Sequence, residues 1–268
     1  MNKGDIVRLE FSLWLADTNA LHNTNIEALA KEQNTYHEEH RYVPLPYIAG
    51  SGGFYAPIEE SILSAKVGEE LEVKVTPDMG EGDRKADLVQ IFPLRRIAAL
   101  PQYKKEEAFP NIGDHVEVEG REGRIVAIIA GRVRVDFNHE LAGKTLRFKY
   151  TVTEVATELD TKIKAMIDMV YRYSSDFHIS EKGGVIGIVI PEVCKYDPAW
   201  TLGKMKLVSL LREHVDFKSV HLIEEWTKAP PVEKKEEKAE EHKHEEHKHE
   251  HKHEEPKEEK RPEEKKEG

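Results

Sequence analysis

The chain has 268 residues, of which 34% are charged, and a formal net charge of −11 at pH 7. Both the body and residues 230–268 are acidic, which argues against a nucleic-acid partner bound through its phosphates. A single cysteine, Cys194, excludes an internal disulfide framework and suits a reducing compartment. The sequence shows neither the apolar core of a signal peptide nor an apolar run of ~18 residues, so we expect a soluble, cytoplasmic protein.

The first ninety residues alternate strand patterns with short helices. Apolar and polar residues alternate over residues 6–15, which predicts a half-buried strand, and Asn25 is placed to cap a helix over 26–33. Gly50-Ser51-Gly52-Gly53 lacks the Gly-Lys-Ser/Thr of a phosphate loop, so we interpret it as a turn. Pro57 can begin a helix over 58–65. Further strands are predicted at residues 44–48, 71–75 and 87–92.

The strand pattern restarts between Leu94 and Thr145. Strands near 115–118, 122–129 and 132–136 fit a small all-β unit inserted between two strands of a parent barrel, which would close with residues 146–155. The chain then follows an αββαβ pattern, which suggests a separate α+β unit. In that unit we interpret Tyr171, Trp200 and Met205, which lie at helical spacing, as core residues. We interpret Cys194 as a buried structural thiol.

One stretch points to a family. Val135-Asp136-Phe137-Asn138-His139-Glu140-Leu141-Ala142-Gly143-Lys144-Thr145-Leu146 closely resembles the junction where the insert-in-flap domain returns to the barrel in SlyD-like and long archaeal FKBP-type prolyl isomerases. The resemblance covers roughly residues 4–156. It includes Val43-Pro44-Leu45-Pro46, Gly50-Ser51-Gly52, Ile58-Glu59-Glu60 and Thr76-Pro77-Asp78-Met79-Gly80-Glu81-Gly82, in matching order and spacing.

The resemblance implies an α+β protein with an antiparallel sheet wrapping a short helix. An FKBP-like isomerase domain would comprise residues 1–93 plus 146–156, and an insert-in-flap chaperone domain residues 94–145. A C-terminal α+β domain would span 157–228, where similar domains in archaeal relatives suggest dimerisation, and a disordered tail would span 229–268. The implied activity is cis–trans isomerisation of Xaa-Pro bonds in unfolded or nascent polypeptides, with no cofactor required.

The resemblance also implies a binding site. An apolar cleft for the prolyl ring would be lined by Tyr47, Phe54, Tyr55, Ile58 and Phe148. The Tyr55 backbone N–H would donate to the substrate carbonyl, and Leu45 falls at a wall position of the cleft. Among the apolar residues of the insert, Ile125 and Ile128 would contact unfolded chains. The alternative interpretation of the cleft residues is ordinary barrel core.

Some positions depart from the family pattern. Ser12 stands where the family has a first-strand tyrosine, His22-Asn23 stand at its Phe-Asp pair, and Glu81 replaces the tyrosine that meets the substrate. These changes place polar groups at the rim of a cleft that works by excluding water. We therefore expect His22, Asn23 and Glu81 to contact the substrate and to weaken catalysis. A holdase that binds clients without useful catalysis remains an alternative.

Six closely spaced histidines lie among Lys and Glu in the tail: His242, His244, His247, His249, His251 and His253. Imidazoles two or three residues apart can chelate Ni²⁺, Zn²⁺, Co²⁺ or Cu²⁺ near neutral pH. A highly charged, solubilising tail is the simpler interpretation, and a metal-handling protein is a third candidate function.

Overall fold

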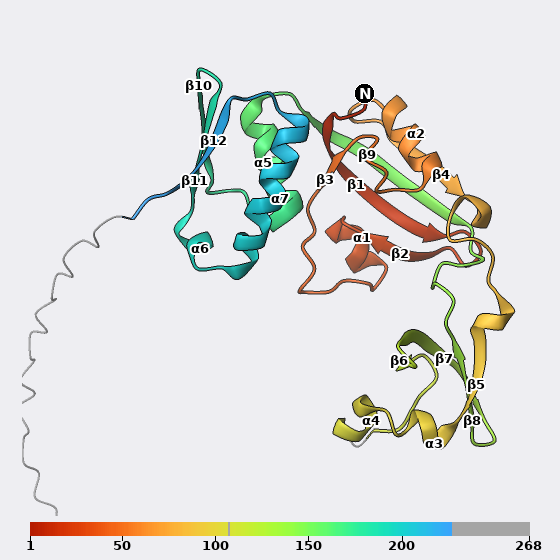
Figure 1. The fold of residues 1–268 in the computed structure, drawn as a ribbon. Coiled ribbons are helices and arrows are strands. Elements are labelled where there is room, and N and C mark those ends of the chain that lie inside the picture. Colours follow the sequence, from red (N-terminus) through yellow and green to blue (C-terminus); the bar gives the residue numbers. More distant parts are fainter. Residues whose placement is uncertain (107, 227–268) are drawn as a thin grey trace, which may run out of the picture. The chain divides into compact units, whose positions relative to one another are not determined.

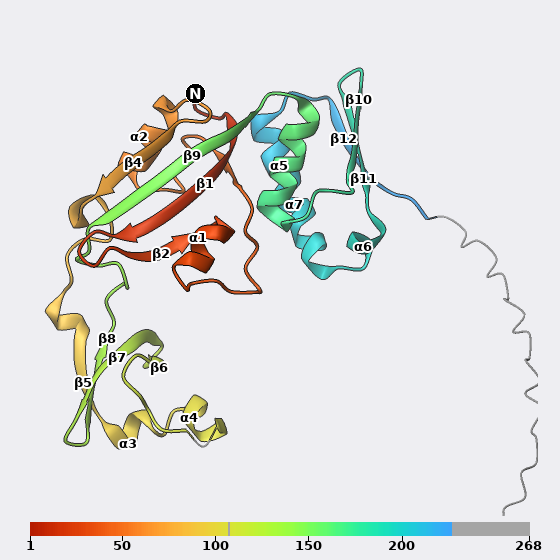
Figure 2. The same cartoon turned by 180° about the vertical axis from the view of Figure 1, so that it is seen from behind.

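A computed structural model describes residues 1–106 and 108–226 of the chain. It is a mixed α+β structure, as the sequence predicted, and residues Met1–Glu225 form one compact unit that contains three β-sheets (Figures 1 and 2). Within the described residues, no helix is long and apolar enough to cross a membrane.

The N-terminal sheet has five strands, all paired antiparallel: β1 (Ile6–Leu15), β2 (Ala20–Thr24), β3 (Leu45–Ile48), β4 (Glu70–Val75) and β9 (Leu146–Ala156). Buried residues alternate along β9, which identifies one core-facing side of the strand. Helix α2 (Ala56–Ser64) lies against this sheet (Figure 1). Its Ile58 and Ile62 belong to the same apolar core as the buried residues of β9. The predicted antiparallel sheet around a short helix is therefore present.

The edge of β1 is shared by two strands that do not meet. β3 pairs with Ile6–Leu9, whereas β2 pairs with Ser12–Leu15. Asn25 closes the gap: its side-chain oxygen accepts from Phe11 N at 2.7 Å, and its amide donates to Leu9 O at 2.7 Å and Val43 O at 3.0 Å. The predicted N-cap role of Asn25 is therefore wrong. Helix α1 (Glu27–Glu32) has Ile26 at its N-cap without a side-chain cap, because the Asn25 amide is used by the sheet.

A second sheet has the strand order β5-β8-β7-β6, all antiparallel, with bounds Val89–Pro93, Arg132–Asp136, Arg121–Ile129 and His115–Val118. The prediction of an all-β unit was incomplete, since short helices α3 (Leu94–Ile97) and α4 (Pro101–Glu106) also occur here. Ile97 and Tyr103 of these helices pack in the core of this sheet, because a sheet must bury its apolar face against another element. The prediction that residues 87–92 belong to the isomerase domain, before the insert, is wrong for β5, which pairs with β8 of the second sheet.

The C-terminal elements follow the predicted αββαβ order with one additional short helix. They are α5 (Leu159–Tyr171), β10 (His178–Lys182), β11 (Val185–Ile190), α6 (Glu192–Lys195), α7 (Pro198–His214) and β12 (Ser219–Glu224). β11 lies between β10 and β12 and runs parallel to β12. Asp197 caps α7 by accepting from Ala199 N at 2.8 Å.

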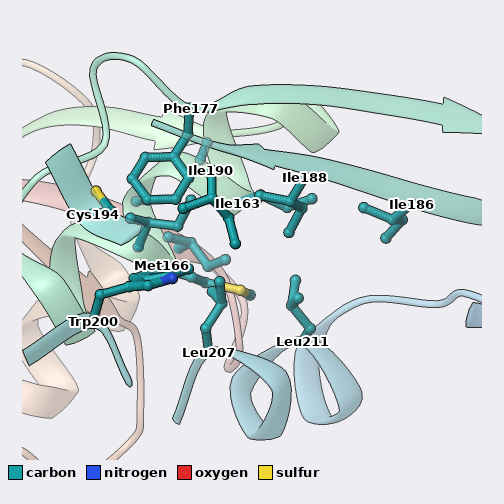
Figure 3. Packing of buried hydrophobic residues seen from close by; sticks show 14 of the residues in the cluster. Ile163, Met166, Phe177, Ile186, Ile188, Ile190, Cys194, Trp200, Leu207 and Leu211 are labelled. Atoms are coloured by element: carbon teal, nitrogen blue, oxygen red, sulfur yellow. The ribbon is translucent and has the colours of Figure 1, made fainter. Parts of the chain in front are cut away.

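The core of this C-terminal region lies between the helices and the sheet (Figure 3). Trp200 and Cys194 are buried there as predicted, and burial raises the pKa of the Cys194 thiol. The prediction for Met205 was wrong, because its side chain is 68% exposed. Leu207 and Leu211 face the core instead, on the side of α7 where Gly203 lies against the carbonyl of Val170.

Helix α5 also packs against the N-terminal sheet, on the face opposite to α2. Ile6, Ile48 and Ala156 are register partners across three strands and belong to the same apolar cluster as α5. Beside them, Arg8 Nη2 lies 2.7 Å from Asp168 Oδ2 of α5. The N-terminal sheet is therefore covered on both faces.

The two chain segments that connect the first and second sheets are held together at Asp136, the last residue of β8. Arg84 Nε donates to its carboxylate at 2.8 Å, and Asn138 exchanges two hydrogen bonds with the Lys85 backbone at 2.8 and 2.9 Å. Burial alone would raise the pKa of Asp136. The hydrogen bonds from Asn138 and the Arg84 guanidinium outweigh that effect and hold this pKa below its ordinary value.

We expect the Asp136 carboxylate to stabilise the fold at neutral pH and to lose this effect in acid. Because its pKa is lower in the folded state, its contribution is complete above the ordinary carboxyl range and disappears as pH falls through the folded pKa, below about 4. Asp136→Asn should lower the free energy of unfolding by about 1–2 kcal/mol at pH 7 and flatten its decline below pH 5. Urea unfolding at pH 3–7 measures both; parallel pH profiles for the two proteins would contradict the assignment.

Candidate functional site

The five predicted cleft side chains belong to one apolar cluster on the core-facing side of the N-terminal sheet, with Tyr55 packed at its edge. Ring centroids of Tyr47 and Phe54 are 4.7 Å apart, and those of Phe54 and Phe148 are 5.3 Å apart. Ile58 of α2 belongs to the same apolar cluster. We call Tyr47, Phe54, Tyr55, Ile58 and Phe148 the aromatic cluster.

The aromatic cluster has a buried floor and a partly exposed rim. Ile58 is 1% exposed and Phe148 2% exposed, whereas Tyr47, Phe54 and Tyr55 are half-buried. Four surface hollows of the described chain are lined by other residues. The cluster is thus a packed apolar surface at which Tyr47, Phe54 and Tyr55 can meet a ligand, and its role as a prolyl site stays a prediction.

A buried carboxylate orders the loop at this rim. Glu59 accepts from the Tyr47 hydroxyl, from Phe54 N at 3.0 Å and from Gly50 N at 3.1 Å. Gly53 must lack a side chain here, because an added Cβ would lie 2.9 Å from Tyr47 Cε2. Sequence reasoning missed Glu59, because nothing in Glu59-Glu60 distinguishes the buried residue from its exposed neighbour.

Tyr55 offers two polar groups at the edge of the aromatic cluster. Its backbone N–H has no hydrogen-bond partner among the described residues, as the predicted substrate donor requires. Its hydroxyl donates to Glu81 at 2.7 Å. Burial and this bond raise the pKa of Tyr55 to about 12, so the hydroxyl remains protonated at neutral pH.

Glu81, predicted to contact substrate, does lie at this rim, where it also approaches the return from the second sheet. Its Oε2 is 3.6 Å from His139 Nδ1. Ser12, by contrast, is buried and accepts from Trp14 Nε1 at 2.9 Å. The three departures from the family pattern are therefore not gathered at one place.

Leu45 and Asn23 lie around a separate hollow of about 670 Å³, and His22 is half-buried on β2 outside its lining. Phe11 lines this hollow and also stacks on Phe148, with centroids 5.5 Å apart. It thereby connects the hollow to the aromatic cluster. Phe11 was not among the predicted site residues, although it follows Leu9 by two residues on β1 and therefore lies on the same face of the strand.

In the second sheet, the predicted client contact at Ile125 is wrong. Ile125 is 1% exposed and lies in the core, and Ile128 is half-buried against that core. Ile129 is instead 69% exposed and, with the exposed Ile91, borders a hollow of about 330 Å³. The register of β7 shifts between Ile125 and Ala127, so simple alternation cannot locate the exposed residues.

The six tail histidines lie outside the described residues. Within residues 1–106 and 108–226, no group of three or more His, Cys, Asp or Glu side chains is arranged to hold a metal ion.

We expect Glu59→Ala to lower the free energy of unfolding by about 2–4 kcal/mol, because three donors lose their acceptor. Glu59→Gln should lose less, since an amide oxygen still accepts. The matched control is Glu60→Ala on the exposed side of α2, which should stay within about 0.5 kcal/mol of the parent. Urea unfolding compares the three variants, and equal losses at positions 59 and 60 would refute the role of Glu59.

Comparison with known proteins identifies the family. Residues 96–141 match a family profile described as the FKBP26 IF domain, and residues 160–227 match one described as the FKBP26 C-terminal. A short-type peptidyl-prolyl cis-trans isomerase of Methanocaldococcus jannaschii is 34% identical over 155 residues, which cover 58% of this chain and 94% of that protein.

Two bacterial relatives agree. The FKBP-type 16 kDa isomerase of Escherichia coli is 30% identical over 122 residues, 44% of this chain and 77% of the relative. The FKBP-type isomerase SlyD of Helicobacter pylori is 28% identical over 109 residues, 41% of this chain and 57% of the relative. The chain belongs to the FKBP-type peptidyl-prolyl cis-trans isomerases, as a SlyD-like member with an insert-in-flap domain.

Proposed function

We propose that this protein isomerises Xaa-Pro bonds of other polypeptides at the aromatic cluster. The observation that carries the proposal is the Tyr55 N–H, which has no partner within the described part of the chain and belongs to the residue beside an apolar floor formed by Ile58 and Phe148. An apolar surface accepts the prolyl ring, and a fixed backbone donor holds a neighbouring carbonyl. Glu59 accepts hydrogen bonds from Gly50 N and Phe54 N and so keeps in place the loop that leads to Tyr55.

The chemistry requires no proton transfer. The barrier of ~18–20 kcal/mol to rotation about the amide arises because twisting destroys its resonance. The twisted amide is less polar than the planar one, so a surface that excludes water stabilises it preferentially. The Tyr55 hydroxyl, held protonated by burial and by Glu81, remains neutral beside the substrate.

The insert would hold unfolded clients. Ile91 and Ile129 expose apolar side chains around one hollow, flanked by Arg132 and Arg134. Exposed apolar surface of this kind is available to unfolded chains. A weakly catalytic holdase is the alternative, since Glu81 places a carboxylate at the rim of the cleft.

The proposal includes a domain organisation and a dimer. The chain would be organised as isomerase domain, insert, C-terminal domain 157–228 and tail 229–268. The predicted boundary at residue 93 moves to residue 88, because β5 pairs with β8, so that the isomerase domain would comprise 1–88 plus 146–156 and the insert 89–145. The C-terminal domain would form a homodimer. Exposed Leu202 and Met205 on α7 support an interface there, because they lie outside its core.

Two sets of variants should separate isomerisation from client holding. Phe54→Ala removes a rim ring and should lower kcat/KM for a short Xaa-Pro peptide by about tenfold or more in a protease-coupled assay. Ile91→Ser with Ile129→Ser should leave that value unchanged and abolish suppression of client aggregation.

The matched control is Val67→Ser, an exposed apolar residue outside the second sheet. It should change neither property. Absence of any acceleration by the parent protein at micromolar concentration would remove the catalytic proposal and leave the holdase.

The tail would bind Ni²⁺ or Zn²⁺ through its six histidines. Calorimetry with Ni²⁺ should show that a chain ending at Trp226 loses most binding relative to the full chain. Undiminished binding by the shortened chain would exclude the tail as the source of ligands.

A further inference from the structure

The hollow beside the aromatic cluster is formed by two parts of the chain that the sequence assigned to different domains. Its volume is about 670 Å³. From the N-terminal sheet come Phe11, Asn23, Leu45 and the segment before β3, and from α5 come Asp168, Met169 and Arg172. We call it the α5 hollow.

The α5 hollow lies where the edge of β1 is not paired. β3 ends its pairing at Leu9, β2 begins at Ser12, and Asn25 fills the intervening hydrogen bonds. Arg8, on the other face of β1, is tied to Asp168 of α5 at 2.7 Å. The lining therefore includes residues from both faces of β1, such as Arg8 and Phe11. It lies at the gap between β3 and β2 along one edge of β1.

The α5 hollow and the aromatic cluster are linked through one side chain, Phe11. Leu45 pairs with Leu9, and Phe11, two residues further along β1, stacks on Phe148 of the cluster floor. A polypeptide whose prolyl ring contacts the cluster can thus place a neighbouring residue on Phe11 and Leu45. The apolar lining continues with Val43, Pro44 and Met169.

The charges around the hollow distinguish it from the rest of the acidic chain. The charge of Arg8 is engaged by Asp168 and Glu154. Arg41 and Arg172 are exposed and form no ion pair within the described residues, and Glu39 is the remaining acidic group of the lining. The lining residues alone carry three arginines and two carboxylates, a net charge of +1, on a chain of net charge −11, and Arg41 and Arg172 favour an acidic ligand.

We propose that the α5 hollow binds the client segment next to the isomerised proline, and that Arg41 and Arg172 select clients with an acidic residue in that segment. The inference rests on the proposed isomerase function and extends it: α5 becomes part of the client-binding site. The occupant is an extended peptide with apolar residues and at least one Asp or Glu near its proline.

The test compares substrates of different length and charge. We expect kcat/KM to be about three- to tenfold higher for a twelve-residue, single-proline peptide with flanking Glu than for the same peptide with flanking Lys. The difference should shrink at 1 M NaCl. Arg41→Glu with Arg172→Glu should reverse the preference and leave kcat/KM for a tetrapeptide unchanged, because the tetrapeptide does not reach α5.

The control is Arg212→Glu, which makes the same charge change at an exposed position of α7. It should preserve the preference for the Glu peptide. Equal kcat/KM for the Glu and Lys peptides would overturn the inference, as would a reversal of the preference by Arg212→Glu. In either case, turnover of the tetrapeptide would leave the isomerase proposal standing.

Binding of a fluorescent Glu peptide, followed by anisotropy, tests the hollow independently of turnover. Weaker binding to the Arg41→Glu, Arg172→Glu protein supports the site even if no isomerisation is found. If a chain ending at Trp226 binds this peptide more tightly, and the charge-reversed variants lose that gain, the chain's own C-terminal segment is the occupant and the client assignment fails.

Discussion

Because successive side chains of a strand point to opposite faces, the ten residues of β1 must serve two partners at once. Val7 and Leu9 face α2 and the aromatic cluster, whereas Ile6 and Arg8 face α5. A shift of one residue in this register would exchange the two sets and bury Arg8 in the core behind the cleft. β1 pairs with β9 along all ten residues, with an extra residue of β9 between the partners of Arg8 and Leu9. Burial of Val7 and Leu9 on one face disfavours such a shift.

This constraint explains why the proposed site lies where it does. β3 and β2 approach the same edge of β1 from opposite ends and leave Leu9 and Phe11 with unpaired backbone groups, which Asn25 satisfies. Buried backbone groups rarely remain unpaired, so a single amide here replaces part of a strand. The hollow at this edge is lined by Phe11, which stacks on Phe148 of the aromatic cluster, and by residues of α5.

The rim of the aromatic cluster depends on a second buried polar group. Glu59 holds Tyr47 and the backbone of the loop at residues 50–54, and this loop leads directly to Tyr55. A carboxylate that accepts several hydrogen bonds can be buried at acceptable cost, and its removal would leave donors without partners. Order in the loop, and thereby the position of the Tyr55 N–H, follows from this one side chain.

Local periodicity in the sequence determined most strands of both antiparallel sheets and the αββαβ order, because alternation and helical spacing are properties of neighbouring residues; β2 was not predicted. The grouping of Tyr47, Phe54, Ile58 and Phe148 was predicted from the family resemblance, and the structure brings these side chains together. Tertiary structure alone decided the burial of Glu59, the use of Asn25 in the sheet and the exposure of Ile129 in place of Ile125. It also decided that Met205 faces outward and that α5 borders the site. Each of these outcomes depends on pairing between residues distant in the chain, or on a shift of register within a strand, and neither leaves a local pattern in the sequence.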